Sequence, residues 1–343
     1  MTDIKSLTIE ELKEFVSSLG EKPYRAAQLY DWMHVRHVTS FDEMSNLPKS
    51  FREKLAATAT LSVIKPVQEL ISREDGTRKY LFELEDGNII ESVLMRYAHG
   101  LSICISSQVG CRMGCRFCAS TIDGLVRNLR PSEMVEQIYR AQDIIGERIS
   151  HVVIMGSGEP MDNFDSFLRF LELTDISHRN ITVSTCGIVP KIYELADAHT
   201  QITLAVSLHA PNDEIRRQTM PVANKYSMDE ILKACRYFFE KTGRRVTFEY
   251  SLIRGVNDSA ECAQELAGRI KPLNAHVNLI PVNPVKEREY EQPYKETVAA
   301  FRSELERYGI NVTIRREMGR DISGACGQLR RHYKESNESS STD

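Results

Sequence analysis

Long apolar runs are absent from this sequence of 343 residues. A helix that crosses a bilayer needs about 20 consecutive apolar residues. The longest candidates, HVVIM at 151–155 and ITLAVSLHA at 202–210, only have the length of buried strands. The start of the chain, MTDIKSLTIEELKEF, is acidic and amphipathic and lacks the apolar centre of a secretory signal. We therefore expect a cytoplasmic protein with no membrane partner.

An excess of positive charge is also absent, because 44 lysines and arginines face 48 aspartates and glutamates. The formal net charge of -4 excludes a generally basic nucleic-acid binder. It leaves room for a local basic surface, which is what a phosphate backbone senses.

The eight cysteines do not follow the pattern of an extracellular disulfide framework, because four of them lie together between residues 104 and 118. Cys111, Cys115 and Cys118 have the spacing C-x3-C-x2-C, and Cys104 precedes them by seven residues. In a reducing compartment, such a group indicates metal or redox chemistry.

Two metal centres compete for these thiolates. A tetrahedral zinc site would take Cys104 as its fourth ligand, and an iron–sulfur cluster also usually takes four cysteines. Zinc sites usually repeat a C-x2-C pair, which only Cys115 and Cys118 form here, and no histidine follows at finger spacing. The spacing therefore favours the cluster. Three cysteines on four irons leave one iron open, and an open iron indicates chemistry.

Hydrophobic periodicity changes twice along the chain. Residues 1–58 have helical periodicity, with Thr8 as an N-cap, and residues 76–95 alternate between turn signals at Asp75-Gly76 and Asp86-Gly87. From about residue 100, short apolar strands alternate with amphipathic helices, beginning with LSICIS and the helix that Pro131 opens. About six such units predict an α/β fold, a partial (β/α)6 barrel with an N-terminal helical accessory domain and a β-meander. Its site should lie at the carboxyl ends of the strands.

The cysteine motif after the first strand of a βα repeat resembles the radical S-adenosylmethionine (radical SAM) superfamily. The resemblance implies a [4Fe-4S] cluster on Cys111, Cys115 and Cys118, with S-adenosylmethionine (SAM) bound to the open iron. The segment MGSGEP at 155–160 is similar to the superfamily's GGEP segment, which contacts the cofactor's amino group. The segments STCG, SLH and NPV follow later strands in the same way. The cofactor-binding residues implied are Gly158, Glu159, Ser184, Ser207, Leu208, His209 and Asn283.

Longer segments resemble one family within this superfamily, the RlmN family of RNA adenine C2-methyltransferases, over nearly the whole chain. They are CISSQVGCRMGCRFCAST, RNLRPSEMVEQI, GEPMDN, SLHAPNDEIRRQTMP, GVNDS and DISGACGQL. The segment GEKPYRAAQLYDWM also resembles the family's accessory domain. The sequence departs from the family pattern at Ser157, where methionine is common, and at Cys186, where serine is common. Both departures would alter cofactor packing.

The resemblance also implies a mechanism. Carbon C2 of adenine is electron-poor, so polar methyl transfer should fail there, whereas radical addition does not need a nucleophilic carbon. Cys326 would be methylated by one SAM molecule, and a second SAM would yield a 5′-deoxyadenosyl radical that activates this methyl group for addition. Cys104 would release the product by forming a disulfide with Cys326, and Glu91 would remove the C2 proton. Cys104 would therefore be kept out of the cluster.

Plainer interpretations stand beside these roles. A single cysteine such as Cys104 is more often a small buried apolar residue, and we expect this of Cys186, Cys235 and Cys262. Glu91 can be an ordinary strand residue, and His209 a hydrogen-bonded core histidine. Glu159 beside Pro160 can cap a helix.

The substrate implied is 23S rRNA, with tRNA as a second. Arginines surround the cysteine loop and the segment around Cys326, which favours phosphate contacts. They are Arg112, Arg116, Arg127, Arg130, Arg315, Arg316, Arg320, Arg330 and Arg331. The target adenine must leave its stack to enter a barrel. An electron donor such as flavodoxin or ferredoxin is the other partner implied, and we expect a monomer.

Residues 1–95 are expected to form the accessory domain with a β-hairpin linker, likewise in contact with RNA. The radical SAM barrel and its C-terminal catalytic loop should span 96–335, before a disordered tail at 336–343. The alternatives are an enzyme of the same family that methylates C8 of adenine and confers ribosomal antibiotic resistance, and a non-catalytic zinc-stabilised RNA-binding protein. A radical SAM activase acting on a protein is a third. GEPMDN favours C2, because the C8 enzymes lack this proline, and an activase would have no use for Cys326.

Overall fold

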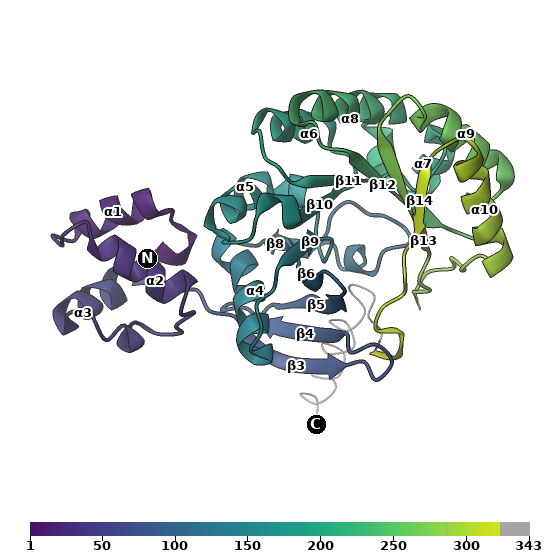
Figure 1. Cartoon of the computed structure of the whole chain (residues 1–343). Helices are drawn as coiled ribbons and strands as arrows, with labels where there is room; N and C mark the ends of the chain where they lie inside the picture. Colours follow the sequence, from purple (N-terminus) through teal and green to yellow (C-terminus); the bar gives the residue numbers. More distant parts are fainter. Residues whose placement is uncertain (286, 323–343) are drawn as a thin grey trace.

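A computed structural model describes residues 1–285 and 287–322 of the chain. In this part, one sheet of ten strands forms the centre of the molecule, and a small helical module lies beside it (Figure 1). The strand order is β14-β13-β12-β11-β10-β9-β6-β5-β4-β3. The predicted fold class, a partial barrel with a meander and a helical module, is confirmed.

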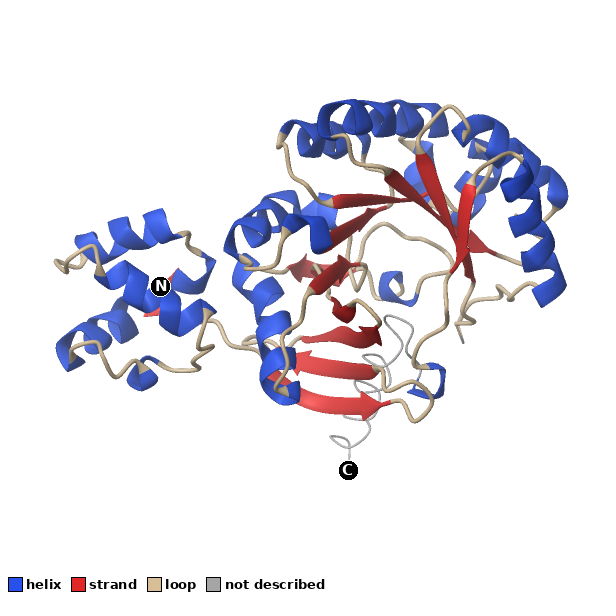
Figure 2. Cartoon of the chain, viewed as in Figure 1, coloured by secondary structure: helices blue, strands red, loops and turns tan. Residues whose placement is uncertain are grey.

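The strands from β6 to β14 in this sheet pair in parallel, as the βα alternation predicts. They are β6 (Gly100–Cys104), β9 (His151–Ile154), β10 (Ile181–Thr185), β11 (Thr203–Ser207), β12 (Val246–Leu252), β13 (Ala275–Pro281) and β14 (Asn311–Ile314). The helices between them cover the outer face of the curved sheet (Figure 2). They are α4 (Pro131–Ile145), α5 (Phe164–Leu173), α6 (Val189–Asp197), α8 (Met228–Thr242), α9 (Ala260–Ile270) and α10 (Lys295–Arg307). Pro131 occupies the first turn of α4 as predicted.

The meander extends the barrel sheet at its other edge. Its strands β3 (Lys65–Ile71), β4 (Arg78–Glu83) and β5 (Ile89–Tyr97) are antiparallel, and β5 pairs with β6. Both predicted turns are present, since Gly76 and Gly87 have φ of +71° and +77°. Tyr80, Phe82 and Ile90 belong to the same apolar core as the barrel. The meander thus packs as part of the barrel, although the sequence predicts that it belongs with the accessory domain of residues 1–95.

The helical module has a separate core. Its helices are η1 (Ile4–Ser6), α1 (Ile9–Ser18), α2 (Arg25–His34), η2 (Phe41–Glu43) and α3 (Lys49–Thr58), with a short parallel pair β1 (Thr2–Asp3) and β2 (Ala59–Thr60). Thr8 and Glu11 form the capping box that starts α1, so the predicted N-cap is confirmed. The module is fastened to helix α4 by the fully buried ion pair Lys5–Glu136, whose Nζ and Oε1 lie 2.6 Å apart. The boundary between the core of the helical module and the core of the barrel therefore lies near residue 60.

Three short elements near the site are absent from the sequence prediction. Strands β7 (Gln108–Gly110) and β8 (Leu125–Asn128) form a hairpin around the cysteine loop, and helix α7 (Asp213–Thr219) follows β11. Each is too short to show a hydrophobic period. No helix in the described part of the chain is long and apolar enough to cross a membrane.

Candidate functional site

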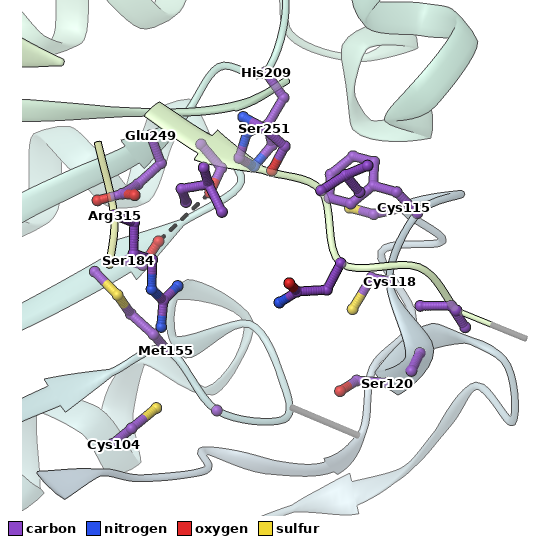
Figure 3. A pocket seen from close by; sticks show the side chains of 18 of the residues that line it. Cys104, Cys115, Cys118, Ser120, Met155, Ser184, His209, Glu249, Ser251 and Arg315 are labelled. Carbon is purple, nitrogen blue, oxygen red and sulfur yellow. Dashed lines mark hydrogen bonds between the residues drawn. The ribbon is translucent and has the colours of Figure 1, made fainter. Parts of the chain in front are cut away.

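A cavity of about 460 Å³ opens at the carboxyl ends of the barrel strands, where the fold predicts the site. It brings the three motif cysteines together with most of the cofactor-binding residues that the sequence predicts. Those that line it are Cys111, Cys115, Cys118, Gly158, Glu159, Ser184, Ser207, His209 and Asn283. The side chains labelled in Figure 3 come from both walls of this space.

The cysteine loop is closed by the β7–β8 hairpin and by its own backbone. The amide of Cys111 donates to the carbonyl of Gly124 at 2.9 Å. The amide of Cys118 donates to the carbonyl of Cys115, and the hydroxyl of Thr121 donates to both cysteine carbonyls at 3.0 Å. These bonds hold a loop with little regular structure, so that three thiols face one cavity.

The thiols of Cys111 and Cys115 are protonated unless a metal binds them. Burial raises the pKa of Cys111 to about 12 and that of Cys115 well above its usual value, and the neighbouring motif cysteines add to both shifts. A bound metal would displace these protons. Among the described residues, no three His, Cys, Asp or Glu side chains converge on one ion position. Thiolates that each bind a different iron need not converge in this way, so the loop fits an iron–sulfur cluster better than a single zinc.

Gly158 and Glu159 lie in the loop after β9, packed against the residues before β7. The amide of Glu159 donates to Oε1 of Gln108 at 2.8 Å. The Glu159 carboxylate accepts from the amides of Met161 and Cys186, at 3.0 and 2.7 Å. Burial raises the pKa of this carboxyl group, and the amide donors oppose the shift. A buried acid at the wall of the cavity can hold a cationic group such as an amine.

His209 takes one tautomer because of its backbone contacts. Its Nδ1 accepts a hydrogen bond of 2.8 Å from the amide of Ser251, and Phe117 packs edge-on at 5.0 Å between ring centroids. Burial lowers the pKa of His209 to about 3, so the ring is neutral and Nε2 carries the proton. His209 is thus a hydrogen-bonded buried histidine that also lines the cavity. Ser184 and Ser207 line the same cavity, with their hydroxyls 3.5 Å apart.

Leu208 is placed differently from the other predicted cofactor residues. Its side chain is fully buried in the barrel core and does not line the cavity. Its amide donates to the carbonyl of Glu249, and its carbonyl accepts from Nε of Arg216 at 3.2 Å. The amide and the carbonyl group of Leu208 are thus both hydrogen-bonded to other parts of the protein.

Cys104 lies apart from the other motif cysteines. Figure 3 places it with Met155 on one side of the cavity and Cys115 and Cys118 on the other. It packs in a small apolar cluster with Val93, Met95 and Met318. This separation agrees with a thiol that does not bind the metal centre.

Glu91 lies two residues before Val93 on strand β5, on the same face of the sheet. It is buried, and its Oε2 lies 3.3 Å from Nζ of the fully buried Lys79. It is therefore no ordinary exposed strand residue, although it is not part of the cavity wall described above.

Cys326, Arg330 and Arg331 lie outside the described residues, and so does one half of the predicted disulfide.

Three of the four arginines around the cysteine loop form ion pairs with acids of the chain. Arg127 contacts Asp86 and Glu133, and Arg130 contacts Glu85 and Glu133. Arg112 pairs with Asp162. These contacts stabilise the β7–β8 hairpin and the start of α4. The charge pattern of the sequence could not reveal the pairs with Glu85, Asp86 and Asp162, because these acids are distant in sequence. Arg315, Arg316 and Arg320 line the cavity.

The two departures from the family pattern lie at the site. Cys186 lines the cavity and binds Glu159 through its amide, whereas Ser157 is buried behind the loop, with its amide donating to Ser106. Cys235 and Cys262 are buried in α8 and α9, as expected for core residues. Glu249 and Ser251 also line the cavity, although the sequence interpretation did not include them. Both alternate with apolar residues along β12, and this alternation is the sequence signal that could have placed them on one face of the strand.

Comparison with known proteins agrees with this geometry. The radical SAM superfamily model matches residues 105–266, and the model of the ribosomal RNA large subunit methyltransferase N-terminal domain matches residues 2–61. The chain is 63% identical to a probable dual-specificity RNA methyltransferase RlmN of Lachnospira eligens, covering 98% of this chain and 97% of that protein. It is 54% identical to a protein of the same name from Clostridioides difficile, over 96% and 98% of the two chains.

A solved structure extends the agreement to the fold. A radical SAM methyltransferase from Sphaerobacter thermophilus superposes with a TM-score of 0.90 at 42% identity, covering 96% of this chain and 99% of that one. Radical SAM enzymes use a [4Fe-4S] cluster and SAM, for which the cysteine loop and cavity described above are suited. The chain thus belongs to the RlmN family of radical SAM RNA methyltransferases.

Proposed function

We propose that this enzyme methylates C2 of adenine in 23S rRNA and in tRNA, with two SAM molecules and a methyl group carried by Cys326. Bound together, the cluster and SAM supply the radical chemistry that an electron-poor carbon requires. The dual-specificity name of the relatives and the match of the N-terminal module support two RNA classes, one of them ribosomal. Flavodoxin or ferredoxin is the proposed electron donor, and a monomer the proposed form.

The motif cysteines would hold the cluster, and Glu159 the amino group of SAM. Ser184, Ser207 and His209 supply hydrogen-bonding groups on the adjoining wall of the cavity. Asn283 follows β13 on the same cavity. Leu208 would act by shaping the turn between Ser207 and His209. These residues orient the cofactor and exclude water from it.

The position of Cys104 is the observation that carries the proposal. It faces the cavity from the wall opposite the cluster loop, and Met318 packs in the same apolar cluster (Figure 3). Met318 precedes Cys326 by only eight residues, a stretch that spans at most about 29 Å. Cys104 is thereby suited to attack the sulfur of Cys326 and release the methylated RNA. Glu91, on the neighbouring strand, is the proposed base for the C2 proton.

The first test is mass spectrometry of Cys326 in protein purified from cells. Peptide mapping of the native enzyme should find a methyl or methylene group on Cys326. The Cys104→Ala variant should carry a covalent RNA adduct there, because the product cannot be released. Cys262→Ala, which removes a cysteine of helix α9, should show no adduct. An unmodified Cys326 with an intact cluster, and no adduct in Cys104→Ala, would contradict the carrier role.

The modified nucleoside decides between carbon C2 and carbon C8. Ribosomal RNA and tRNA from cells with and without the enzyme are digested, and their nucleosides are compared with 2-methyladenosine and 8-methyladenosine standards. We expect 2-methyladenosine in both RNA classes only when the enzyme is present. The C8 isomer would replace this proposal by the alternative activity.

A further inference from the structure

Arg216 of helix α7 is fully buried behind the cavity and has no role in the mechanism above. Its Nη2 donates to the carbonyls of Cys186 and Ser207, at 2.6 and 3.3 Å, and its Nε donates to the carbonyl of Leu208. The guanidinium therefore joins the ends of β10 and β11, the strands that carry Ser184 and Ser207.

The remaining nitrogen, Nη1, is buried without a hydrogen-bond partner among the described residues. Arginine cannot lose its proton to escape this environment. A buried charge is costly unless an opposite charge compensates for it. Among the described residues no carboxylate forms an ion pair with Arg216, and Asp213 acts on it only at longer range, so a bound anionic group would complete the compensation.

The cysteine loop lies directly against this segment. The amide of Arg116, between Cys115 and Cys118, donates to the carbonyl of Thr219 at the end of α7, at 2.8 Å. A Cβ at Gly114 would lie 3.3 Å from the ring of Pro221, so the two segments are in close contact. Cys186, whose carbonyl accepts from Nη2 of Arg216, lines the same cavity as Cys111, Cys115 and Cys118. The guanidinium thus lies directly behind the wall of the cavity that the cluster ligands share.

A cluster on three thiolates would supply the missing negative charge, and its reduction adds one more electron. Glu159, which is buried at the same cavity, would as a carboxylate oppose that reduction. A fixed cation favours the reduced, more negative form, and the effect is large where water is excluded.

We propose that Arg216 is a positioning residue of the cluster site, whose buried charge raises the reduction potential of the [4Fe-4S] cluster. The electron comes from a low-potential one-electron donor and stays on the cluster, which changes from its 2+ to its 1+ state. The same side chain holds the ends of β10 and β11 in register with the cysteine loop. This role does not depend on the RNA substrate.

The test is an anaerobic redox titration of the reconstituted full-length enzyme, followed by electron paramagnetic resonance without SAM or RNA. Arg216→Gln keeps hydrogen-bond donors but removes the charge. At a fixed potential it should lower the ratio of reduced to oxidised cluster at least about tenfold, a shift of about 59 mV for a one-electron couple. Arg216→Lys should stay close to the wild-type value. Arg217→Gln, the neighbouring exposed position, should not change it.

Iron and sulfide content shows whether each variant holds its cluster. Arg216→Met provides a second neutral side chain. If both neutral variants lose the cluster while Arg216→Lys keeps it, the charge is required for assembly, which supports the assignment. A neutral variant with a full cluster and an unchanged midpoint potential would overturn it. Loss of the cluster in all three variants, or an Arg216→Lys shift equal to that of Arg216→Gln, would assign Arg216 a purely structural role.

Discussion

Gly158 lies where the loop after β9 comes close to Gln108, at the start of β7. Its φ of +108° is a backbone conformation that side chains rarely adopt, and an added Cβ would lie 2.6 Å from Cβ of Gln108 and 2.7 Å from its amide nitrogen. The neighbouring Glu159 depends on this approach, because its amide binds the Gln108 side chain. The single glycine thus sets the position of the cavity's buried acid.

We predict that Gly158→Ala lowers the free energy of unfolding by about 1–3 kcal/mol and weakens SAM binding. Chemical denaturation and equilibrium binding to the cluster-loaded enzyme would measure the two effects. Gly268→Ala is the matched control, since it lies in helix α9 with no atom within 4 Å of its added Cβ. There alanine should stabilise by about 0.5–1 kcal/mol. Equal behaviour of the two variants would exclude the proposed steric cause.

At the scale of elements, the turn between β3 and β4 holds the segment that leads toward Cys326. Oδ2 of Asp75 accepts from the amide of Gly319 at 2.9 Å, and Asp321 accepts from the amide of Arg73 at 2.8 Å. Burial alone would raise the pKa of Asp75, but hydrogen bonds from the amides of Gly319 and Thr77 outweigh it and hold the pKa at about 2. The contact is therefore present above about pH 4 and is lost as the pH falls through about 2.

We predict that Asp75→Ala speeds hydrogen exchange at the Gly319 amide roughly fivefold, which corresponds to about 1 kcal/mol for a lost hydrogen bond. Mass spectrometry of the peptide that contains Gly319 would measure the rate. The methylation rate should fall too, because the segment before Cys326, the proposed methyl carrier, is less well held. Glu74→Ala, an exposed neighbour, should change neither quantity. An unchanged exchange rate in Asp75→Ala would show that the turn does not hold this segment.

At the scale of the whole molecule, the helical module is a docked part of the enzyme. Besides the Lys5–Glu136 pair, Arg169 of α5 binds Glu11 with two nitrogens, at 2.7 and 2.8 Å. His34 of α2 is buried at the same interface, with Nδ1 2.9 Å from the hydroxyl of Tyr139. These contacts orient the module relative to the cavity, so RNA would meet one composite surface.

Burial lowers the pKa of His34 to about 3. His34 therefore takes up a proton near pH 6.5 in the unfolded chain but stays neutral in the folded chain down to about pH 3. Its contribution to the free energy of unfolding is fully present above pH 6.5 and falls as the pH decreases toward 3. His209 adds a second contribution of the same sign, because burial lowers its pKa to about 3 as well. Each histidine should contribute about 1.4 kcal/mol per pH unit in this range.

We predict that His34→Gln lowers the slope of stability against pH by about 1.4 kcal/mol per pH unit. Urea unfolding between pH 4.5 and 7.5, at constant ionic strength, would measure it. His199→Gln, at an exposed position, serves as the control. If His34→Gln and the wild type have equal slopes, protonation of His34 does not govern docking of the module.

The sequence by itself determined those features whose cause is local. Cys111, Cys115 and Cys118 lie within eight residues, so their spacing alone limits where a cluster can bind. The alternation of strands and helices, the Thr8 cap and the glycines of both meander turns were likewise readable, because each depends on neighbouring residues.

Only the tertiary structure decided which distant residues meet. The arginines of the cysteine loop bind acids up to 50 residues away, Leu208 enters the core, and Glu91 is paired with Lys79 across adjacent strands. The meander shares the barrel's core although its sequence reads as a separate unit. Arg216 shows the same limit, because helix α7 is too short to have a period and its partners are carbonyls of distant strands. Such contacts depend on register, strand order and desolvation, which are properties of the folded chain and not of any short segment.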